Sequence, residues 1–350
     1  MRIACLFSDR PGPQQDMLLD CLVYGLSRAF GSLNVTDVFR KAQYRLEDAE
    51  FLGEWPFNLG STAFYAKPEA PRQAGKLDCV SAMDVLRGTN VFVVNVRFLQ
   101  YAVAEGVCDQ NTLEALTYFA NPKNTILIDS SDSPRDWRGD PLVHKYIGGD
   151  PKLFCCRPGA DCDHRLVIAV PIDHIWRVRA TFGVRTCPGV YGNSLFLHAA
   201  WNDNGPVRRA LMERLVRSKR HDWSLNWGSA SGYSIEGTSP LPNPASYYAE
   251  MGRARVVVAA RGAGIDTLRQ SEAMAMGACL ITDDFGFDQA RHRDHVLYFN
   301  DADTMIEQIE YAMSNPEDRE RIAKNGQRLY LDALCPEQQA VNMIRKAGLL

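Results

Sequence analysis

The sequence predicts an α/β protein of two domains, each built around a parallel sheet. The chain has 350 residues, which suggests two domains at roughly 100–200 residues each. Short apolar runs alternate with helical patterns, as is typical of parallel α/β architecture. A cluster of glycines and prolines at 183–192 interrupts this series, and a second series follows it.

The first series occupies residues 1–185. Its buried strands are expected at Arg2–Phe7, Val91–Val96, Thr125–Asp129 and Leu166–Val170, with a helix over Gln15–Phe30. Residues 50–75 carry aromatic, glycine and proline residues without a clear period. We expect them to form an irregular insertion or lid.

The second series occupies residues 186–335. Its expected strands are Leu195–Leu197, Arg255–Ala260, Cys279–Thr282 and Val296–Phe299. Its expected helices are Pro206–Lys219, Thr267–Met276, Asp303–Ser314 and Pro316–Ala333. A last helix at Pro336–Ala347 leaves residues 336–350 as a C-terminal element that can pack back on the first domain.

The composition is that of an ordinary soluble protein. The hydrophobic share is 46%, the charged share is 23% and the formal net charge is −3, so no nucleic-acid or membrane partner is required. No stretch approaches the ~20 apolar residues of a membrane span, and the first apolar run is too short for a secretory signal. Ten cysteines in a chain of this size favour free thiols in a reducing compartment. We therefore expect a cytoplasmic protein, and leave open a peripheral membrane contact through a lipid-linked acceptor.

One group of residues has the chemistry of a metal site. Cys155, Cys156, Cys162 and His164 could supply four ligands, but no CxxC pair is present. The alternative is a strand end with buried thiols followed by a turn. The letters Asp161-Cys162-Asp163 lack the apolar strand that would precede a manganese-binding Asp-x-Asp. We expect no metal.

The most informative segment runs from Arg261 to Ala278, because it follows a strand, passes through a glycine-containing turn and opens a helix. In such a turn Gly262 and Gly264 let a ligand approach the backbone, and Asp266 or Thr267 can cap the helix. The first-turn amides then form a phosphate seat. A purely structural strand–turn–helix is equally open on this pattern alone.

Charged side chains complete this segment. Arg261 and Arg269 bracket it with charge that suits a diphosphate. Glu272 lies three residues beyond Arg269, on roughly the same helix face, where a carboxylate can accept two hydroxyl protons from a ribose or sugar. The alternative is a surface Arg–Glu pair.

The run Ser271–Thr282 resembles the donor-site signature of glycosyltransferases with two Rossmann-like domains facing across a cleft (GT-B). Residues 247–255, 295–309 and 315–326 resemble its flanking elements, so the likeness covers roughly 190–335. The spacing of Gly264, Asp266, Arg269 and Glu272 is nearest to that of the exostosin-like, spore-maturation-like and group 1 branches. The resemblance implies an acceptor-binding first domain and a second domain that binds a UDP- or GDP-linked sugar, with no other cofactor.

One position departs from the family pattern. The large retaining branch has a second Glu eight positions before the helix Glu, and that position is Gly264 here. The stereochemical outcome is therefore open.

Two further roles follow from the resemblance. A basic residue near the loop at 202–206 neutralises the leaving diphosphate in related enzymes, which implies Arg208 or Arg209; the alternative is a solvated helix face. An inverting enzyme also needs a base at the C-terminal ends of the first domain's strands. Asp9 and Asp132 are candidates, although each could cap a helix or turn, and Glu272 joins them as a candidate catalytic residue.

The sequence therefore predicts a metal-independent hexosyl- or pentosyltransferase that moves a sugar onto an acceptor hydroxyl. The alternatives are a two-domain sugar-nucleotide epimerase and a catalytically inactive nucleotide-sugar-binding module. The acceptor is open among a glycan, a lipid-linked glycan, a protein, a small molecule and a modified nucleobase, and the oligomeric state is open as well.

Overall fold

A computed structural model shows two compact units, each of which is described here by itself. Unit 1 comprises Met1–Val167 and Pro336–Leu350, and unit 2 comprises Ile168–Cys335. The described residues are 1–6, 17–38, 79–97, 99–100, 110–130, 137–155, 162–167, 169–170, 172, 175–176, 195–203, 205–229, 232–242, 244–261, 268–283 and 293–350.

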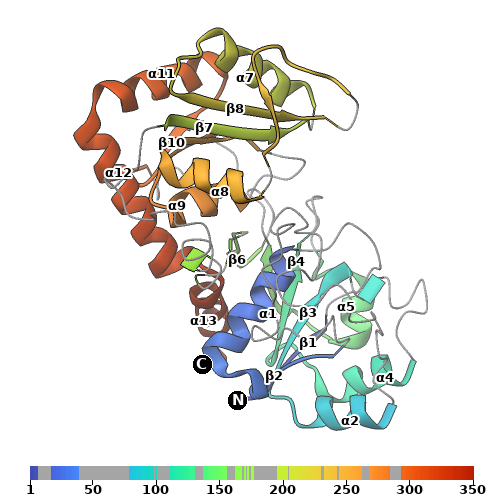
Figure 1. Cartoon of the computed structure of the whole chain (residues 1–350). Helices are drawn as coiled ribbons and strands as arrows, with labels where there is room; N and C mark the ends of the chain where they lie inside the picture. The colour runs from blue at the N-terminus through green and yellow to red at the C-terminus, as the bar shows by residue number, and fades with distance from the viewer. Residues whose placement is uncertain are drawn as a thin grey trace. The chain divides into compact units, whose positions relative to one another are not determined.

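Unit 1 contains a six-stranded parallel sheet (Figure 1). Its strands, in spatial order, are β2 (Val35–Asp37), β1 (Ile3–Leu6), β3 (Val91–Asn95), β4 (Thr125–Asp129), β5 (Lys152–Cys155) and β6 (His164–Arg165). Its helices are α1 (Met17–Phe30), α2 (Cys79–Arg87), α4 (Gln110–Phe119), α5 (Pro141–Tyr146) and α13 (Pro336–Lys346). All residues of β1, β3 and β4 are buried, as expected for strands of a parallel sheet covered on both faces.

The C-terminal helix α13 lies in unit 1, where it packs along α1 (Figure 1). The two helices approach closely at Gly25, where an added Cβ would lie 2.1 Å from the carbonyl oxygen of Pro336. Gln339 of α13 also makes two hydrogen bonds to the main chain of Val167, accepting from its N–H at 2.7 Å and donating to its carbonyl at 2.8 Å. The final helix is thus part of the fold of unit 1.

Unit 2 contains a second six-stranded parallel sheet. Its strands, in spatial order, are β12 (Leu297–Phe299), β11 (Cys279–Asp283), β10 (Ala254–Ala259), β7 (Leu195–Asn202), β8 (Trp223–Gly228) and β9 (Ser239–Pro240). Its helices are α7 (Pro206–Arg217), α8 (Pro244–Arg253), α9 (Leu268–Ala275), α11 (Ala302–Ser314) and α12 (Pro316–Leu329), which continues as a π-helical turn at Tyr330–Leu334.

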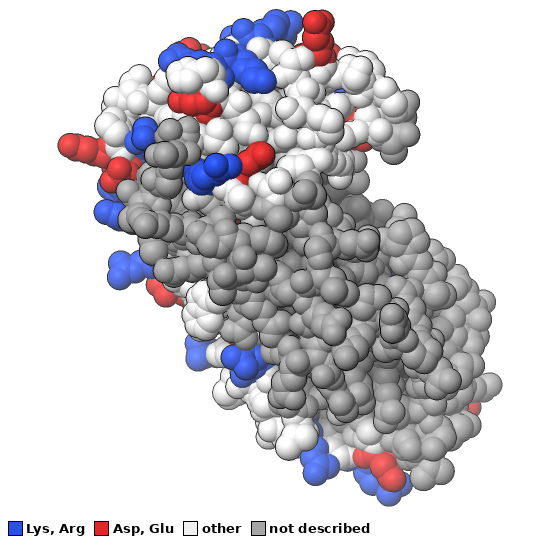
Figure 2. Space-filling model, in the orientation of Figure 1, with Lys and Arg blue, Asp and Glu red and all other residues white. Residues whose placement is uncertain are grey.

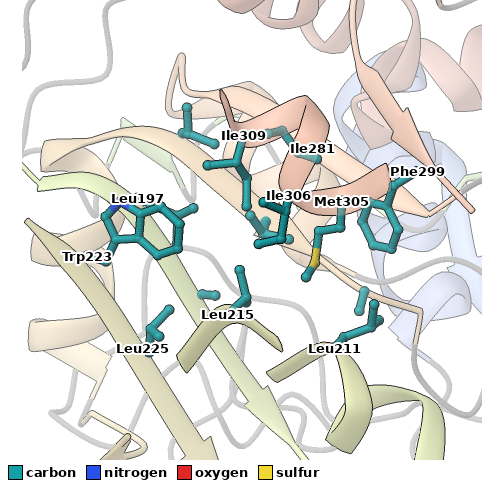
Figure 3. Close-up of a cluster of buried hydrophobic side chains, with 14 of the residues drawn as sticks. Leu197, Leu211, Leu215, Trp223, Leu225, Ile281, Phe299, Met305, Ile306 and Ile309 are labelled. Atoms are coloured by element: carbon teal, nitrogen blue, oxygen red, sulfur yellow. The ribbon is translucent and has the colours of Figure 1, made fainter. Parts of the chain in front are cut away.

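The core of unit 2 lies between its sheet and helices α7 and α11. Figure 3 shows Leu211 and Leu215 of α7 and Met305, Ile306 and Ile309 of α11 among strand residues that include Leu197 and Leu225. Helix α7 begins just after the carboxyl end of β7, and α11 begins just after the carboxyl end of β12. Pro206 occupies the first turn of α7, and the Asp301 side chain caps α11 by accepting from the amide of Thr304. This packing fixes the start of each helix against the sheet edge that carries the site.

The expected α/β class with two parallel sheets is confirmed. The strand expected at Leu166–Val170 is wrong, because its described residues join no sheet, although Leu166, Ala169 and Val170 are buried. The amide of Val170 instead donates to the Ser271 hydroxyl at 3.3 Å, and its carbonyl accepts from Tyr330 at 2.7 Å. The insertion expected at 50–75 lies outside the described residues.

The surface carries charges of both signs. Figure 2 shows Lys and Arg side chains next to Asp and Glu side chains on the described part of the visible face, in keeping with the net charge of −3. Every helix in the described ranges is too short or too polar to cross a membrane.

Candidate functional site

The second sheet reverses its direction of winding between β7 and β10. From β7 the chain passes through α7 to β8, and from β10 it passes through α9 to β11 on the other side. Right-handed crossovers therefore place α7 and α9 on opposite faces. Open α/β sheets bind ligands at the carboxyl ends of the strands where this reversal occurs. The segment that begins at Arg261 follows β10 at this point.

Arg208 lies buried at this switch point, with 4% of its surface exposed. Its guanidinium donates to three main-chain carbonyls: Nε to Arg261 at 2.5 Å, Nη2 to Ala260 at 2.8 Å and Nη1 to Asn202 at 3.1 Å. Burial, together with the charge of Arg269, lowers the pKa of Arg208 to about 10. We expected Arg208 to contact the diphosphate, but all three of its guanidinium nitrogens already donate to main-chain carbonyls.

Arg261 and Asp283 meet at the ends of neighbouring strands. The amide of Arg261 donates to both carboxylate oxygens of Asp283, at 3.1 and 3.0 Å, and its Nε lies 3.7 Å from the same carboxylate. Burial raises the pKa of Asp283, and the contacts with Arg261 oppose this shift. The Arg261 side chain keeps 35% of its surface exposed, so its charge can reach a ligand.

A cavity of about 520 Å³ opens beside these two residues. It lies between the first turns of α7 and α11, and it has an apolar wall and a polar rim. Its lining residues are Val207, Ala210, Leu211, Arg261, Asp283, Phe299, Asn300, Asp301 and Ala302. Its volume is within the range of pockets that hold small organic ligands.

We expected the Glu272 carboxylate to face an open site, but in the structure it does not. It is 3% exposed, and its two oxygens accept hydrogen bonds of 2.7 Å from Tyr247 and Tyr248 of α8. Burial raises the pKa of Glu272, whereas the two tyrosine hydroxyls and the charge of Arg269 act against that shift. The sequence places Arg269 and Glu272 on one helix, but it does not reveal the tyrosine pair.

The remaining donor residues of the predicted segment are Gly262, Gly264, Asp266 and Thr267, and these lie outside the described residues. The segment enters α9 at Leu268, and this helix carries both Arg269 and Glu272. The structure therefore brings Arg208 and Arg261 together at the start of the segment and Arg269 and Glu272 at its end.

The two bases expected in unit 1, Asp9 and Asp132, also lie outside the described residues. At the carboxyl edge of this sheet the structure shows Asn95, which we did not single out, donating to the Ser130 hydroxyl at 2.9 Å. Asn95 also accepts from the amide of Arg97 at 2.8 Å. A polar residue at the end of the apolar run Val91–Val94 was the available signal.

The expected absence of a metal stays a prediction. In the part of the chain that the structure describes, no three His, Cys, Asp or Glu side chains are grouped to hold an ion, and Cys156 is not among these residues. The thiols of Cys155 and Cys162 interact with each other. His198 is 1% exposed and is therefore buried inside unit 2.

Comparisons with known proteins agree with this arrangement. Residues 206–345 match the family model described as glycosyl transferase-like, and a search of curated proteins by sequence found no match. A glycosyltransferase from Rickettsia africae has a TM-score of 0.58 at 10% identity, with 99% of this chain and 97% of that chain covered. The Anabaena protein Alr3699/HepE, solved with UDP and glucose, has a TM-score of 0.57 at 11% identity over 100% of both chains.

A third structure, an alpha-glucosyltransferase with UDP and a 13-mer DNA, has a TM-score of 0.54 at 11% identity and covers 98% and 99% of the two chains. At these identities the three structures share the fold with this chain. The match over residues 206–345 adds the family signature to that fold. Residues 206–345 thus match a glycosyl transferase-like family model, and the chain shares its two-domain, Rossmann-like fold with these glycosyltransferases.

Proposed function

We propose that the chain transfers a sugar from a UDP-linked donor to an acceptor hydroxyl without a metal ion. The observation that carries this proposal is the family match together with the charged switch point inside it, where Arg208, Arg261 and Asp283 meet. The similar Anabaena protein and the alpha-glucosyltransferase were both solved with UDP, which supports uridine over other bases in the donor.

The proposed donor site lies at the carboxyl edge of the second sheet. Its diphosphate would face the amides of residues 262–267, with Gly262 and Gly264 allowing close approach and Asp266 or Thr267 capping α9. Arg261 and Arg269 would supply the positive charge, and the cavity beside Arg261 offers room for an uncharged part of the donor. Because Glu272 is 3% exposed and each of its oxygens accepts a hydrogen bond from a tyrosine, we place it as the anchor of α9 beside the donor.

In the proposed reaction the acceptor oxygen forms a bond to the anomeric carbon while the bond from that carbon to the diphosphate oxygen breaks. The leaving UDP carries the electron pair, and arginine charge with the helix dipole stabilises it. The acceptor hydroxyl gives its proton to a carboxylate of unit 1, for which Asp9 and Asp132 are the candidates. No step in this scheme requires a metal.

The test begins with binding. Calorimetry with UDP, GDP and uridine shows which base the protein prefers and how much the diphosphate contributes to the binding affinity. Turnover is then measured as the release of UDP from a panel of UDP-sugars, with and without EDTA. Arg261→Gln should weaken UDP binding at least tenfold. The matched control, Arg217→Gln, replaces an exposed arginine at the other end of α7 and should leave binding unchanged.

Asp9→Asn and Asp132→Asn separate binding from chemistry. The variant that removes the base should lower turnover at least a hundredfold and leave the UDP dissociation constant within twofold. Failure to bind any nucleotide would refute the proposal, and loss of turnover in EDTA would refute its metal independence. Interconversion of the donor sugar without an acceptor would point to an epimerase instead.

A further inference from the structure

Side chains hold the end of strand β10 on the side where its pairing with β7 stops, while β11 still pairs with it at Val258 and Ala259. Strands β10 and β7 pair through Val256↔Leu197 and Val257↔His198, and this pairing then stops. Beyond this point four successive carbonyls each accept a hydrogen bond from a side chain. The donors are Trp201 Nε1 to Val258 at 3.1 Å, Thr282 Oγ1 to Ala259 at 2.8 Å, Arg208 Nη2 to Ala260 at 2.8 Å and Arg208 Nε to Arg261 at 2.5 Å.

Both the amide and the carbonyl of Arg261 are hydrogen-bonded to side chains of neighbouring elements. Its amide donates to the Asp283 carboxylate on β11, and its carbonyl accepts from Arg208 on α7. The same guanidinium also binds the carbonyl of Asn202 at the end of β7. One buried side chain thus ties the diverging ends of β7 and β10 together, directly before residues 262–267.

We infer that Arg208 and Asp283 are positioning residues, which clamp the backbone of Arg261 and so set where the phosphate-binding segment begins. This inference rests on the proposed donor site, and it differs from the direct diphosphate contact that the sequence suggested for Arg208. The guanidinium substitutes for the sheet bonds that β7 and β10 lose as they diverge. Buried carbonyls need such partners, because leaving them unpaired is costly.

The first experiment measures amide hydrogen exchange of residues 258–268 in the protein without ligand. Arg208→Met, which keeps the apolar stem and removes all three donors, should speed exchange in this segment at least tenfold. Asp283→Ala should do the same, and Asp283→Asn, which keeps an acceptor for the Arg261 amide, should restore slow exchange. The matched control is Arg319→Met, because Arg319 is also buried, at 5% exposure, and donates to a carbonyl, that of Ala312, elsewhere in unit 2.

The second experiment measures the dissociation constant of UDP in the same variants. Arg208→Met and Asp283→Ala should raise it at least tenfold, and Asp283→Asn should raise it less than Asp283→Ala does. Arg319→Met should leave it within twofold even where this variant lowers the melting temperature. Arg208→Lys, which keeps the charge and three N–H donors, should lie between wild type and Arg208→Met in both readouts. If Arg208→Met does not fold, the Arg208→Lys and Asp283 variants decide the question.

Slow exchange in Arg208→Met together with weaker UDP binding would overturn the clamp in favour of a direct diphosphate contact. Faster exchange with unchanged UDP binding would also overturn it, because the segment would then not be positioned for the donor. If the wild-type protein binds no nucleotide, the proposed function fails. In that case the exchange data alone still show whether Arg208 and Asp283 hold this segment.

Discussion

Tyr248 donates its hydroxyl to Oε1 of Glu272 at 2.7 Å, while its neighbour Tyr247 donates to Oε2 at the same distance. Both tyrosines and the glutamate are buried. Glu272→Ala should therefore lower the free energy of unfolding, by about 1–3 kcal/mol for each hydroxyl left without a partner. Urea denaturation followed by circular dichroism measures this loss.

Removing one tyrosine hydroxyl tests the same arrangement while keeping the Glu272 carboxylate in place. Tyr248→Phe should cost about 1–3 kcal/mol, because a buried carboxylate loses one of its two tyrosine donors. Tyr311→Phe is the matched control, since the Tyr311 hydroxyl bonds Asp318 at the surface and should contribute less than about 0.5 kcal/mol. Equal losses in the two variants would contradict the buried role of Tyr248.

His198 should make stability depend on pH. Burial lowers its pKa, Glu250 at 3.5 Å from Nδ1 acts the other way, and the charge of Arg269 adds to the lowering, while the ring of Tyr247 packs edge-on. In the unfolded chain this histidine is protonated at about pH 6.5, whereas in the folded chain its ring stays neutral to lower pH. The unfolded state then binds more protons, so the free energy of unfolding falls as pH drops below about 6.5.

Glu250 acts in the same direction at lower pH, because its pKa is lowered by His198 and Ser224 although burial would raise it. Its contribution is lost as pH falls through its folded pKa. Urea denaturation between about pH 7.5 and 5 should show a flatter pH dependence for His198→Gln than for wild type. The exposed His221→Gln should keep the wild-type slope, and a flattened slope in that variant instead would refute the assignment.

Gly25 should resist even the smallest side chain. An added methyl would lie 2.1 Å from the Pro336 carbonyl oxygen, so α1 and α13 must separate to admit it. Alanine normally favours a helix by about 1 kcal/mol over glycine, yet overpacking costs about 1–3 kcal/mol or more. We expect Gly25→Ala to destabilise the protein in urea denaturation, whereas Gly139→Ala, with open space around its Cβ, should be neutral.

Cys162 should react slowly despite being only partly buried. Its hydrogen bond with Cys155 and its burial raise its pKa well above the ordinary range, so little nucleophilic thiolate forms. Iodoacetamide at about pH 8 should label Cys162 at least tenfold more slowly in the folded than in the urea-unfolded protein, as followed by mass spectrometry. Cys155→Ala should speed labelling of Cys162, and an unchanged rate would show that the pair does not control it.

The central strands and the donor helix could be predicted from the sequence because their signals are local. The apolar run at 255–260 became β10 at Ala254–Ala259, and the helix expected from Thr267 is described as α9 from Leu268. The run at 166–170 is equally apolar, but Ser271 and Tyr330 take up the polar groups of Val170 in place of a neighbouring strand. Such partners lie 100 or more residues away and leave no periodic trace.

The same limit applies to the site. The likeness to a donor signature identified Arg208 and Glu272, but their surroundings depend on β7, β10 and α8 meeting in space. The carbonyls that engage Arg208 lie 52 and 53 residues further along the chain at Ala260 and Arg261, and the tyrosines that hold Glu272 lie 24 and 25 residues before it. Sequence reasoning could therefore name these side chains, but it could not tell a ligand contact from a structural one.

The return of α13 to α1 has a consequence for how the protein is made. Residues of α1 are synthesised early, but the helix that covers them leaves the ribosome after all of unit 2. Unit 2 is one continuous stretch and can acquire its structure while translation proceeds, whereas the earlier-made unit must wait with part of α1 uncovered. A chain cut short before Pro336 would therefore damage the unit at the opposite end of the sequence.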